Sequence, residues 1–236
     1  MRRKANPINE PAALNFAENL FAVWPDFRPT KALYLDLEGG GSGNEHILSL
    51  YWPQLAGDDR FSMLWRGWPA TSMEPNSLDR ALDGLSCNQD NLEWLVVFSG
   101  GQLNPTEQER FESVFGSGWF PRASWVNLHY PMRQSRLIKQ SVREEKWAVR
   151  RKDSRRVPYS LENLEYQFGY IRSSRLRAHE NIYADGDPGE CKILETEQKA
   201  FEANTQMRGF EVIAEYCSWD VQTMFRIARW CEQNYI

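Results

Sequence analysis

The sequence predicts an α/β fold with one mixed central sheet and helices on both faces of that sheet. Three strand-like segments follow one another near the N-terminus, two later strands alternate with helices, and a long helical tract closes the chain. Strands joined by short turns pair antiparallel, whereas strands that alternate with helices typically pair parallel. We therefore expect three antiparallel strands followed by parallel strands in the same sheet.

Apolar runs bounded by turn residues predict the strands. The first run, KALYLDLEG, is nearly continuous in apolar residues, which favours a strand inside the sheet. The glycine-rich stretch at 39–43 is interpreted as the turn into the second strand, because no phosphate-loop motif follows it. The expected strands are residues 31–39, 46–53, 60–68, 91–101 and 124–130.

Helical periodicity and capping residues predict the helices. Ser77 is the expected N-cap of the second helix. Asn104, with Pro105 at the first helical position, begins the third helix, which Gly116 ends. Gly209 is a candidate break in the last tract. The expected helices are residues 11–24, 77–87, 104–116, 160–169 and 194–234, and the basic stretch 133–156 is either coil or helix.

Length and composition bound the class of protein. A chain of 236 residues and 27.6 kDa with 42% hydrophobic residues suits one large globular domain. We expect residues 1–29 to form an N-terminal arm and helix, and residues 30–236 to form the main domain. The sequence has neither an apolar run long enough to cross a bilayer nor a paired-cysteine motif. A soluble cytoplasmic protein with reduced thiols and no membrane contact is therefore expected.

Positive charge is concentrated in one segment of an otherwise acidic chain. The net charge is −4, yet residues 133–156 contain ten Lys and Arg against three Asp and Glu. Lysine and arginine neutralise phosphates and an aromatic side chain stacks on a base, so contact with nucleic acid is one interpretation. A solvated surface segment is the other. The candidate nucleic-acid-binding residues are Arg143, Lys146, Trp147, Arg150, Arg151 and Lys152.

Two acids lie close together on the first predicted strand. Asp36 and Glu38 are two residues apart, so strand alternation directs both side chains to the same face. Their mutual repulsion and the cost of desolvation require compensation. A divalent cation such as Mg²⁺ or Mn²⁺ provides it through hard oxygen ligands. The alternative is that one acid faces solvent at the end of the strand.

The last helical tract carries a third acid. Tyr216 and Asp220 are spaced i, i+4 and therefore share one helical face. Asp220 lies beside an apolar stripe that includes Val221 and Met224, so we expect it to be at least partly buried and to need a partner. Other catalytic spacings are absent from the sequence, since the three His have no metal-ligand spacing and no GxSxG motif occurs.

Three motifs in order resemble a known superfamily. The segments YLDLEG, YSLENLEYQFG and EYCSWDVQTMFRIARW, on the β/α order given above, resemble the DEDD 3′–5′ exonucleases of ribonuclease H-like fold. The similarity is greatest to the ribonuclease H-like domain that accompanies predicted RecB-family nucleases, and it spans about residues 30–235.

The resemblance implies a fold, a reaction and a set of site residues. It implies a ribonuclease H-like domain in which Asp36, Glu38 and Asp220 bind two Mg²⁺ or Mn²⁺ ions, and in which Tyr216 orients the attacking water. The implied activity is hydrolysis of DNA or RNA phosphodiester bonds from the 3′ end. A larger nuclease or helicase is the implied protein partner. Tyr216 is equally consistent with an aromatic residue of the core.

One expected acid has no obvious counterpart. The superfamily carries an acid after the fourth strand, where this sequence reads FSGGQLNPTEQERF. Glu107 is the best substitute, Gln102 and Asn104 are neutral alternatives, and Glu107 is also explained as a first-turn acid favoured by the helix dipole. The sequence therefore leaves three functions open: an exonuclease, a catalytically degenerate nucleic-acid-binding or scaffold subunit, and an endonuclease on the same fold.

Overall fold

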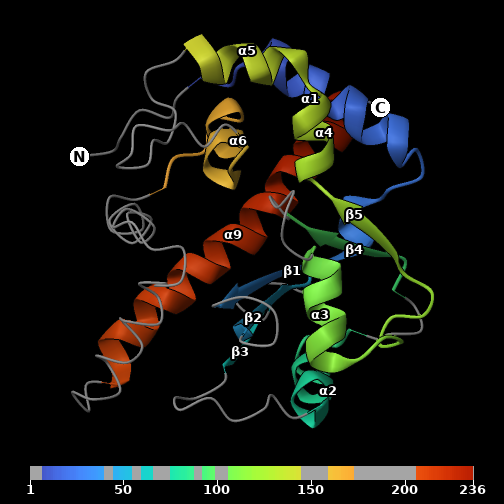
Figure 1. The fold of residues 1–236 in the computed structure, drawn as a ribbon, viewed down its shortest axis with the longest axis vertical. Helices are drawn as coiled ribbons and strands as arrows, with labels where there is room; N and C mark the ends of the chain where they lie inside the picture. The colour runs from blue at the N-terminus through green and yellow to red at the C-terminus, as the bar shows by residue number, and fades with distance from the viewer. Residues whose placement is uncertain are drawn as a thin grey trace.

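Five strands form one mixed sheet in the computed structural model of this chain (Figure 1). They are β1 (Ala32–Gly39), β2 (Glu45–Tyr51), β3 (Phe61–Trp65), β4 (Trp94–Val97) and β5 (Ser124–Asn127). Their order across the sheet is β3-β2-β1-β4-β5. The pairs β1–β2 and β2–β3 are antiparallel, and β1–β4 and β4–β5 are parallel. The predicted meander and the parallel strands after it are therefore confirmed, with β1 in the centre.

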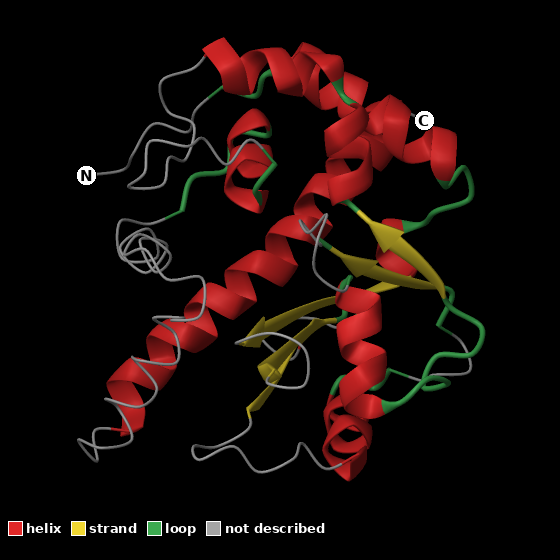
Figure 2. Cartoon of the chain, viewed as in Figure 1, coloured by secondary structure: helices red, strands yellow, loops and turns green. Residues whose placement is uncertain are grey.

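Helices flank this sheet (Figure 2). The structure describes residues 7–39, 45–54, 60–65, 75–87, 92–98, 106–144, 159–172 and 206–235. Within these ranges no helix is both long and apolar enough to cross a bilayer. The α-helices are α1 (Glu10–Val23), α2 (Pro75–Gly84), α3 (Glu107–Phe115), α4 (His129–Gln134), α5 (Arg136–Glu144), α6 (Leu161–Gln167) and α9 (Gln206–Tyr235), and a 3₁₀ turn, η1 (Pro29–Lys31), precedes β1.

Each face of the sheet has its own core, because strand side chains alternate between the two faces. On one face, Tyr34 and Tyr51 pack with apolar residues of α1 and α9 such as Val221. On the opposite face, Leu33 and its neighbours pack with α2 and with Phe111 of α3. Helices therefore cover both faces, as the sequence predicts, and α9 crosses the first face diagonally (Figure 1).

The N-terminal helix belongs to the core of the sheet. Apolar residues of α1 recur at helical spacing, and Phe16 and Leu20 are fully buried. The Phe16 ring meets Phe168, just after α6, edge to face at 5.6 Å between ring centroids. Residues 10–23 thus share one core with the central strands and with α9.

The start of α3 differs from the prediction. Thr106, not Asn104, is its N-cap. The backbone N–H of Glu109 donates to the Thr106 hydroxyl at 3.2 Å, and the N–H of Thr106 donates to Glu109 Oε2 at 2.6 Å. This reciprocal pair is a capping box, which satisfies two otherwise unpaired amides, whereas an Asn104 cap would satisfy one. Gly116 ends the helix as predicted, with φ of +91°.

Three other boundaries also differ. Helix α2 begins at Pro75, so Ser77 lies inside the helix and does not cap it. His129 begins α4 instead of ending a strand, and the first part of the basic stretch forms α4 and α5. Gly209 does not break α9, which is continuous from Gln206. Packing of the later turns of α9 on the sheet outweighs the weak local helix propensity of one glycine.

Candidate functional site

The central strand carries Asp36 on the face that α9 covers. Asp36 follows Tyr34 by two residues, and the Tyr34 ring packs on this face, so strand alternation directs both side chains toward α9. Asp36 is partly buried. Its partner across the antiparallel pair is Ser49 of β2, which is fully buried.

Glu38 follows on the same face at the end of β1. Its backbone pairs with Ile47, and the register between the strands shifts at Glu38 and Gly39. A register shift of this kind marks a local irregularity of the strand pair at Glu38. The Glu38 side chain lies outside the described part of the chain, so the structure gives its place in the strand alone.

Contacts of α9 with the sheet fix which residues lie level with Asp36. The Phe225 ring lies 5.6 Å from the ring of Tyr34, whereas Cys217 packs with Ile47, the partner of Glu38. Along β1, Tyr34 and Glu38 are roughly 13 Å apart, at about 3.3 Å per residue. Along α9, Phe225 and Cys217 are roughly 12 Å apart, at about 1.5 Å per residue. Asp36 lies halfway between Tyr34 and Glu38, so the α9 residues around 221 lie level with Asp36.

Two polar residues of α9 are buried near this level. Asp220 is 4% exposed and Thr223 is fully buried. Among the described residues, the rest of the contact between α9 and the sheet is apolar, with Val221 and Met224 in the core. Thr223 lies one turn after Trp219, on the side of α9 that faces α6. We refer to the polar residues at the contact with the sheet as the polar strip; its members are Asp36, Ser49 and Asp220.

The polar strip contains a hydroxyl group that the described residues do not satisfy. Ser49 Oγ is buried and has no hydrogen-bond partner within the described ranges. The same holds for Thr223 Oγ1 on the side of α9 that faces α6. Burial of a hydroxyl without a hydrogen bond costs about 1–3 kcal/mol in proteins. Unsatisfied groups of this kind are few in folded proteins, and they concentrate where a catalytic role, an ion or an ordered water explains them.

A buried ion triad holds Asp220 from the other side. Arg172, which follows α6, binds Glu165 through two bonds, from Nε to Oε2 at 2.8 Å and from Nη2 to Oε1 at 2.9 Å. The same Nη2 forms an ion pair with Asp220 Oδ1 at 2.6 Å. Glu165 is fully buried and Arg172 is 3% exposed. The triad therefore joins α6 to the middle of α9.

Two aromatic side chains of α9 support the triad. The Trp219 indole N–H donates to Glu165 Oε1 at 3.1 Å, and the Arg172 guanidinium lies 5.3 Å from the centre of the Tyr216 ring. Burial disfavours the charge of Arg172, but the Asp220 and Glu165 carboxylates outweigh burial and raise the pKa of Arg172 well above its ordinary value. Arg172 is therefore a permanent cation. Tyr216 and Asp220 share a face of α9 as predicted, and the Tyr216 ring contacts the guanidinium.

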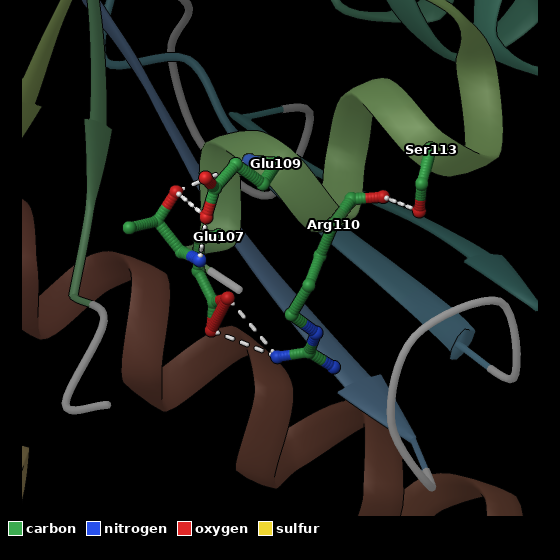
Figure 3. Close-up of polar contacts among 5 residues, drawn as sticks. Glu107, Glu109, Arg110 and Ser113 are labelled. Carbon is green, nitrogen blue, oxygen red and sulfur yellow. Dashed lines mark hydrogen bonds and ion pairs between the residues drawn. The ribbon is translucent and has the colours of Figure 1, made fainter. Parts of the chain in front are cut away.

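Glu107 lies in the first turn of α3, as the sequence predicts, and is buried. Both of its carboxylate oxygens accept hydrogen bonds from Arg110 Nη1, at 3.1 and 3.0 Å. Figure 3 shows Glu107 and Arg110 pointing toward each other, whereas Glu109 turns back to the start of the helix. An arginine in the next turn thus compensates the charge of Glu107.

The described carboxylates do not complete a metal site by themselves. Among the side chains that the structure describes, no three His, Cys, Asp or Glu groups lie close enough together to hold a metal ion. Glu107 is therefore not gathered into one cluster with Asp36 and Asp220. The polar strip fits a divalent cation in its donor chemistry, because it combines hard carboxylate oxygens with the unsatisfied Ser49 hydroxyl. A third carboxylate ligand would have to come from Glu38.

The predicted nucleic-acid-binding residues lie almost entirely outside the described ranges. Arg143 belongs to the last turn of α5, where the structure gives its backbone alone. Lys146, Trp147, Arg150, Arg151 and Lys152 fall between the described residues 144 and 159.

Sequence reasoning missed Glu165, Arg172 and Trp219. One signal was present for Glu165, since Leu161, Leu164 and Phe168 define the apolar face of α6 and Glu165 lies on that face. A buried acid at such a position requires a cationic partner. No comparable pattern marks Arg172, because it lies in an irregular segment after α6.

Comparison with known proteins adds no family to these observations. No protein-family model matches the chain, and neither a curated protein nor a solved structure matches it.

Proposed function

We propose that this chain is a metal-dependent nuclease on a ribonuclease H-like fold, which hydrolyses DNA or RNA phosphodiester bonds as a 3′–5′ exonuclease. The observation that carries the proposal is the polar strip. An acid on the central strand of a β3-β2-β1-β4-β5 sheet lies level with an acid on the final helix, inside an otherwise apolar contact. The unsatisfied hydroxyl of Ser49, opposite Asp36, supports a polar ligand there.

The residues have distinct roles in this proposal. Asp36, Glu38 and Asp220 would hold Mg²⁺ or Mn²⁺. When bound between such carboxylates, divalent ions activate a water and stabilise the leaving oxygen in phosphodiester hydrolysis. Ser49 would hydrogen-bond the Asp36 carboxylate or a bound water. Tyr216 keeps its proposed role of orienting the water through its hydroxyl, while its ring supports Arg172.

The test uses purified protein, Mn²⁺ and a 3′-labelled single-stranded oligonucleotide. Wild-type protein is expected to release labelled mononucleotide, and EDTA is expected to stop the release. Asp36→Asn and Asp220→Asn are each expected to lower the rate by at least roughly 100-fold, because each removes a charged ligand. Asp26→Asn, which changes an exposed turn residue, is the matched control and retains the wild-type rate. Degradation that survives both site changes and EDTA would overturn the proposal.

A second function is favoured by a specific observation. Two of the four candidate metal-ligand carboxylates already pair with arginines, Glu107 with Arg110 and Asp220 with Arg172. A chain whose acids are compensated in this way fits a catalytically degenerate nucleic-acid-binding or scaffold subunit. It would bind oligonucleotide in a salt-sensitive way without Mn²⁺-dependent cleavage, so robust cleavage by purified protein excludes this alternative. Cleavage of a circular single strand, which has no 3′ end, would instead indicate an endonuclease.

A further inference from the structure

We infer that Arg172 is a positioning residue that fixes the orientation of the Asp220 carboxylate, and that Glu165 and Trp219 in turn fix Arg172. The inference rests on the proposed function, in which Asp220 is a metal ligand. The residues were not singled out by the sequence, and their role follows from the geometry of the buried triad.

The first argument is geometric. Glu165 holds the guanidinium by a two-bond contact to Nε and Nη2, which sets the plane of the group. With that plane fixed, Nη2 lies 2.6 Å from Asp220 Oδ1 and forms an ion pair with it, although the angle is not that of a hydrogen bond. This close contact restricts where the Asp220 carboxylate can lie. The Trp219 indole N–H fixes Glu165 Oε1 from α9 itself. A carboxylate offers about four lone-pair sites, so a guanidinium at Oδ1 is compatible with a cation at the same group.

The second argument is that one cation contacts two buried acids. Arg172 pairs with both Glu165 and Asp220, and all three side chains are buried. A purely structural ion pair does not need the second acid on the same guanidinium, because desolvation of each added charge is costly.

The third argument is that hydrogen-bonded neighbours orient the metal ligands of other metalloproteins. Metal-binding carboxylates are usually hydrogen-bonded by neighbouring groups, and loss of such a partner typically lowers metal affinity by about 10–100-fold. Arginine provides this orientation through its rigid fork, whereas the lysine ammonium is a flexible point charge. Arg172→Lys therefore keeps the charge and removes the geometry.

The experiment measures Mn²⁺ binding directly, by electron paramagnetic resonance of the free ion, and nuclease kinetics in parallel. Arg172→Lys and Trp219→Phe are compared with a control variant, Arg229→Lys. Arg229 forms a partly exposed ion pair with Glu232 of α9 at 2.9 Å. Arg172→Lys is expected to weaken Mn²⁺ binding at least tenfold and to lower kcat at saturating Mn²⁺. Trp219→Phe is expected to weaken binding by roughly two- to fivefold, since it removes one neutral hydrogen bond. Arg229→Lys is expected to match the wild type.

The outcomes separate the inference from the function on which it rests. If the wild-type chain binds Mn²⁺ in an Asp36-dependent way and folded Arg172→Lys binds it equally well, the inference is wrong and the proposed function stands. If the wild-type chain binds no Mn²⁺, both fail. If Arg172→Lys does not fold, Trp219→Phe decides, and wild-type Mn²⁺ affinity in that folded variant rejects the inference. Tighter binding by Arg172→Lys also rejects it, because Arg172 would then compete with the metal.

Discussion

At the scale of single residues, the polar strip is the feature that a stable core would not contain without a reason. Ser49 buries a hydroxyl with no hydrogen-bond partner among the described residues, opposite Asp36 and beside an apolar core. Such a hydroxyl costs free energy of folding. Proteins retain costly groups of this kind at functional sites, where stability is exchanged for activity.

Ser49 allows that exchange to be measured with two variants. Ser49→Ala removes the hydroxyl and little else, so its free energy of unfolding should be unchanged or up to about 1 kcal/mol higher. The rate of the proposed nuclease should fall roughly tenfold. Ser49→Thr keeps the hydroxyl and adds a methyl group to a fully buried position, so stability should fall by about 1–3 kcal/mol while the rate is retained. Urea unfolding and oligonucleotide degradation check both; a wild-type rate in Ser49→Ala would contradict the prediction.

His129 is a single residue that makes the free energy of unfolding depend on pH. It is buried between the rings of Phe98 and Tyr159. Burial, followed by the charge of Arg133, lowers the pKa of His129 from 6.5 to about 4. Between these values the unfolded chain binds a proton that the folded chain does not, so the free energy of unfolding falls as the pH drops from 6.5 toward 4.

His129→Gln should remove this contribution. Urea midpoints at about pH 7 and pH 5 are expected to differ less in the variant than in the wild type, because glutamine does not titrate. Carboxylates titrate in both proteins, and the difference between the two proteins isolates His129. Equal pH dependence in both would show that His129 is protonated equally in the folded and unfolded chains.

At the scale of elements, local sequence decides how α3 begins. The capping box between Thr106 and Glu109 satisfies amides of the first turn, and its hydrogen bonds lower the pKa of Glu109. Thr106→Ala should reduce the free energy of unfolding by about 1 kcal/mol, and Thr106→Ser should retain most of it. Ser113→Ala, an exposed hydroxyl later in the same helix, is the control. Equal urea midpoints for Thr106→Ala and Ser113→Ala would argue against a stabilising cap.

Elements also show where long-range packing dominates. Partly buried polar contacts tie α6 to the start of α1 and to α5. Gln167 accepts a hydrogen bond from Asn9, the N-cap residue of α1, at 2.7 Å and donates one to Ser141 of α5 at 3.1 Å. The helix has only two turns and would be marginal in isolation. Its position, and hence that of Glu165, depends on these contacts as well as on its Ser160 cap.

At the scale of the whole molecule, the sheet order brings distant segments to one place. Because β1 is central, Asp36 lies under α9, which closes the chain almost two hundred residues later. The uneven distribution of charge is also a property of the whole molecule, because an acidic chain carries its excess of Lys and Arg in residues 133–156. That segment is the proposed contact with the phosphates of the substrate.

The salt dependence of oligonucleotide binding tests this contact. Replacing Arg150, Arg151 and Lys152 together by Ser should reduce the slope of log K against log salt by about 2, at roughly 0.7 per phosphate contact on a single strand. The control replaces three exposed arginines elsewhere, Arg28, Arg80 and Arg122, by Ser. Fluorescence anisotropy in EDTA, between about 50 and 200 mM salt, measures both. An unchanged slope in the first variant would place the contact elsewhere.

Much of the fold could be predicted from the sequence. Apolar runs and turn residues located all five strands, and the antiparallel and parallel pairings followed from their connections. Asp36, Glu38 and Asp220 stood out because acids beside apolar stripes are costly and therefore conspicuous. The boundaries were less reliable: at α3 a plausible Asn104 cap competed with Thr106, and His129 was assigned to a strand although it begins α4.

The sequence by itself determined which residues form strands and helices and which acids need a partner, because periodicity, capping and charge are local properties. Only the tertiary structure decided the partner of Asp220. Arg172, which follows α6, pairs with Asp220 of α9, whereas Arg110 pairs with Glu107 locally, at i, i+3 within α3. Ion pairs between segments far apart in the chain depend on how α6 and α9 pack, and no local pattern encodes that packing. The same physical reason explains why the polar strip became visible only when α9 was placed on the sheet.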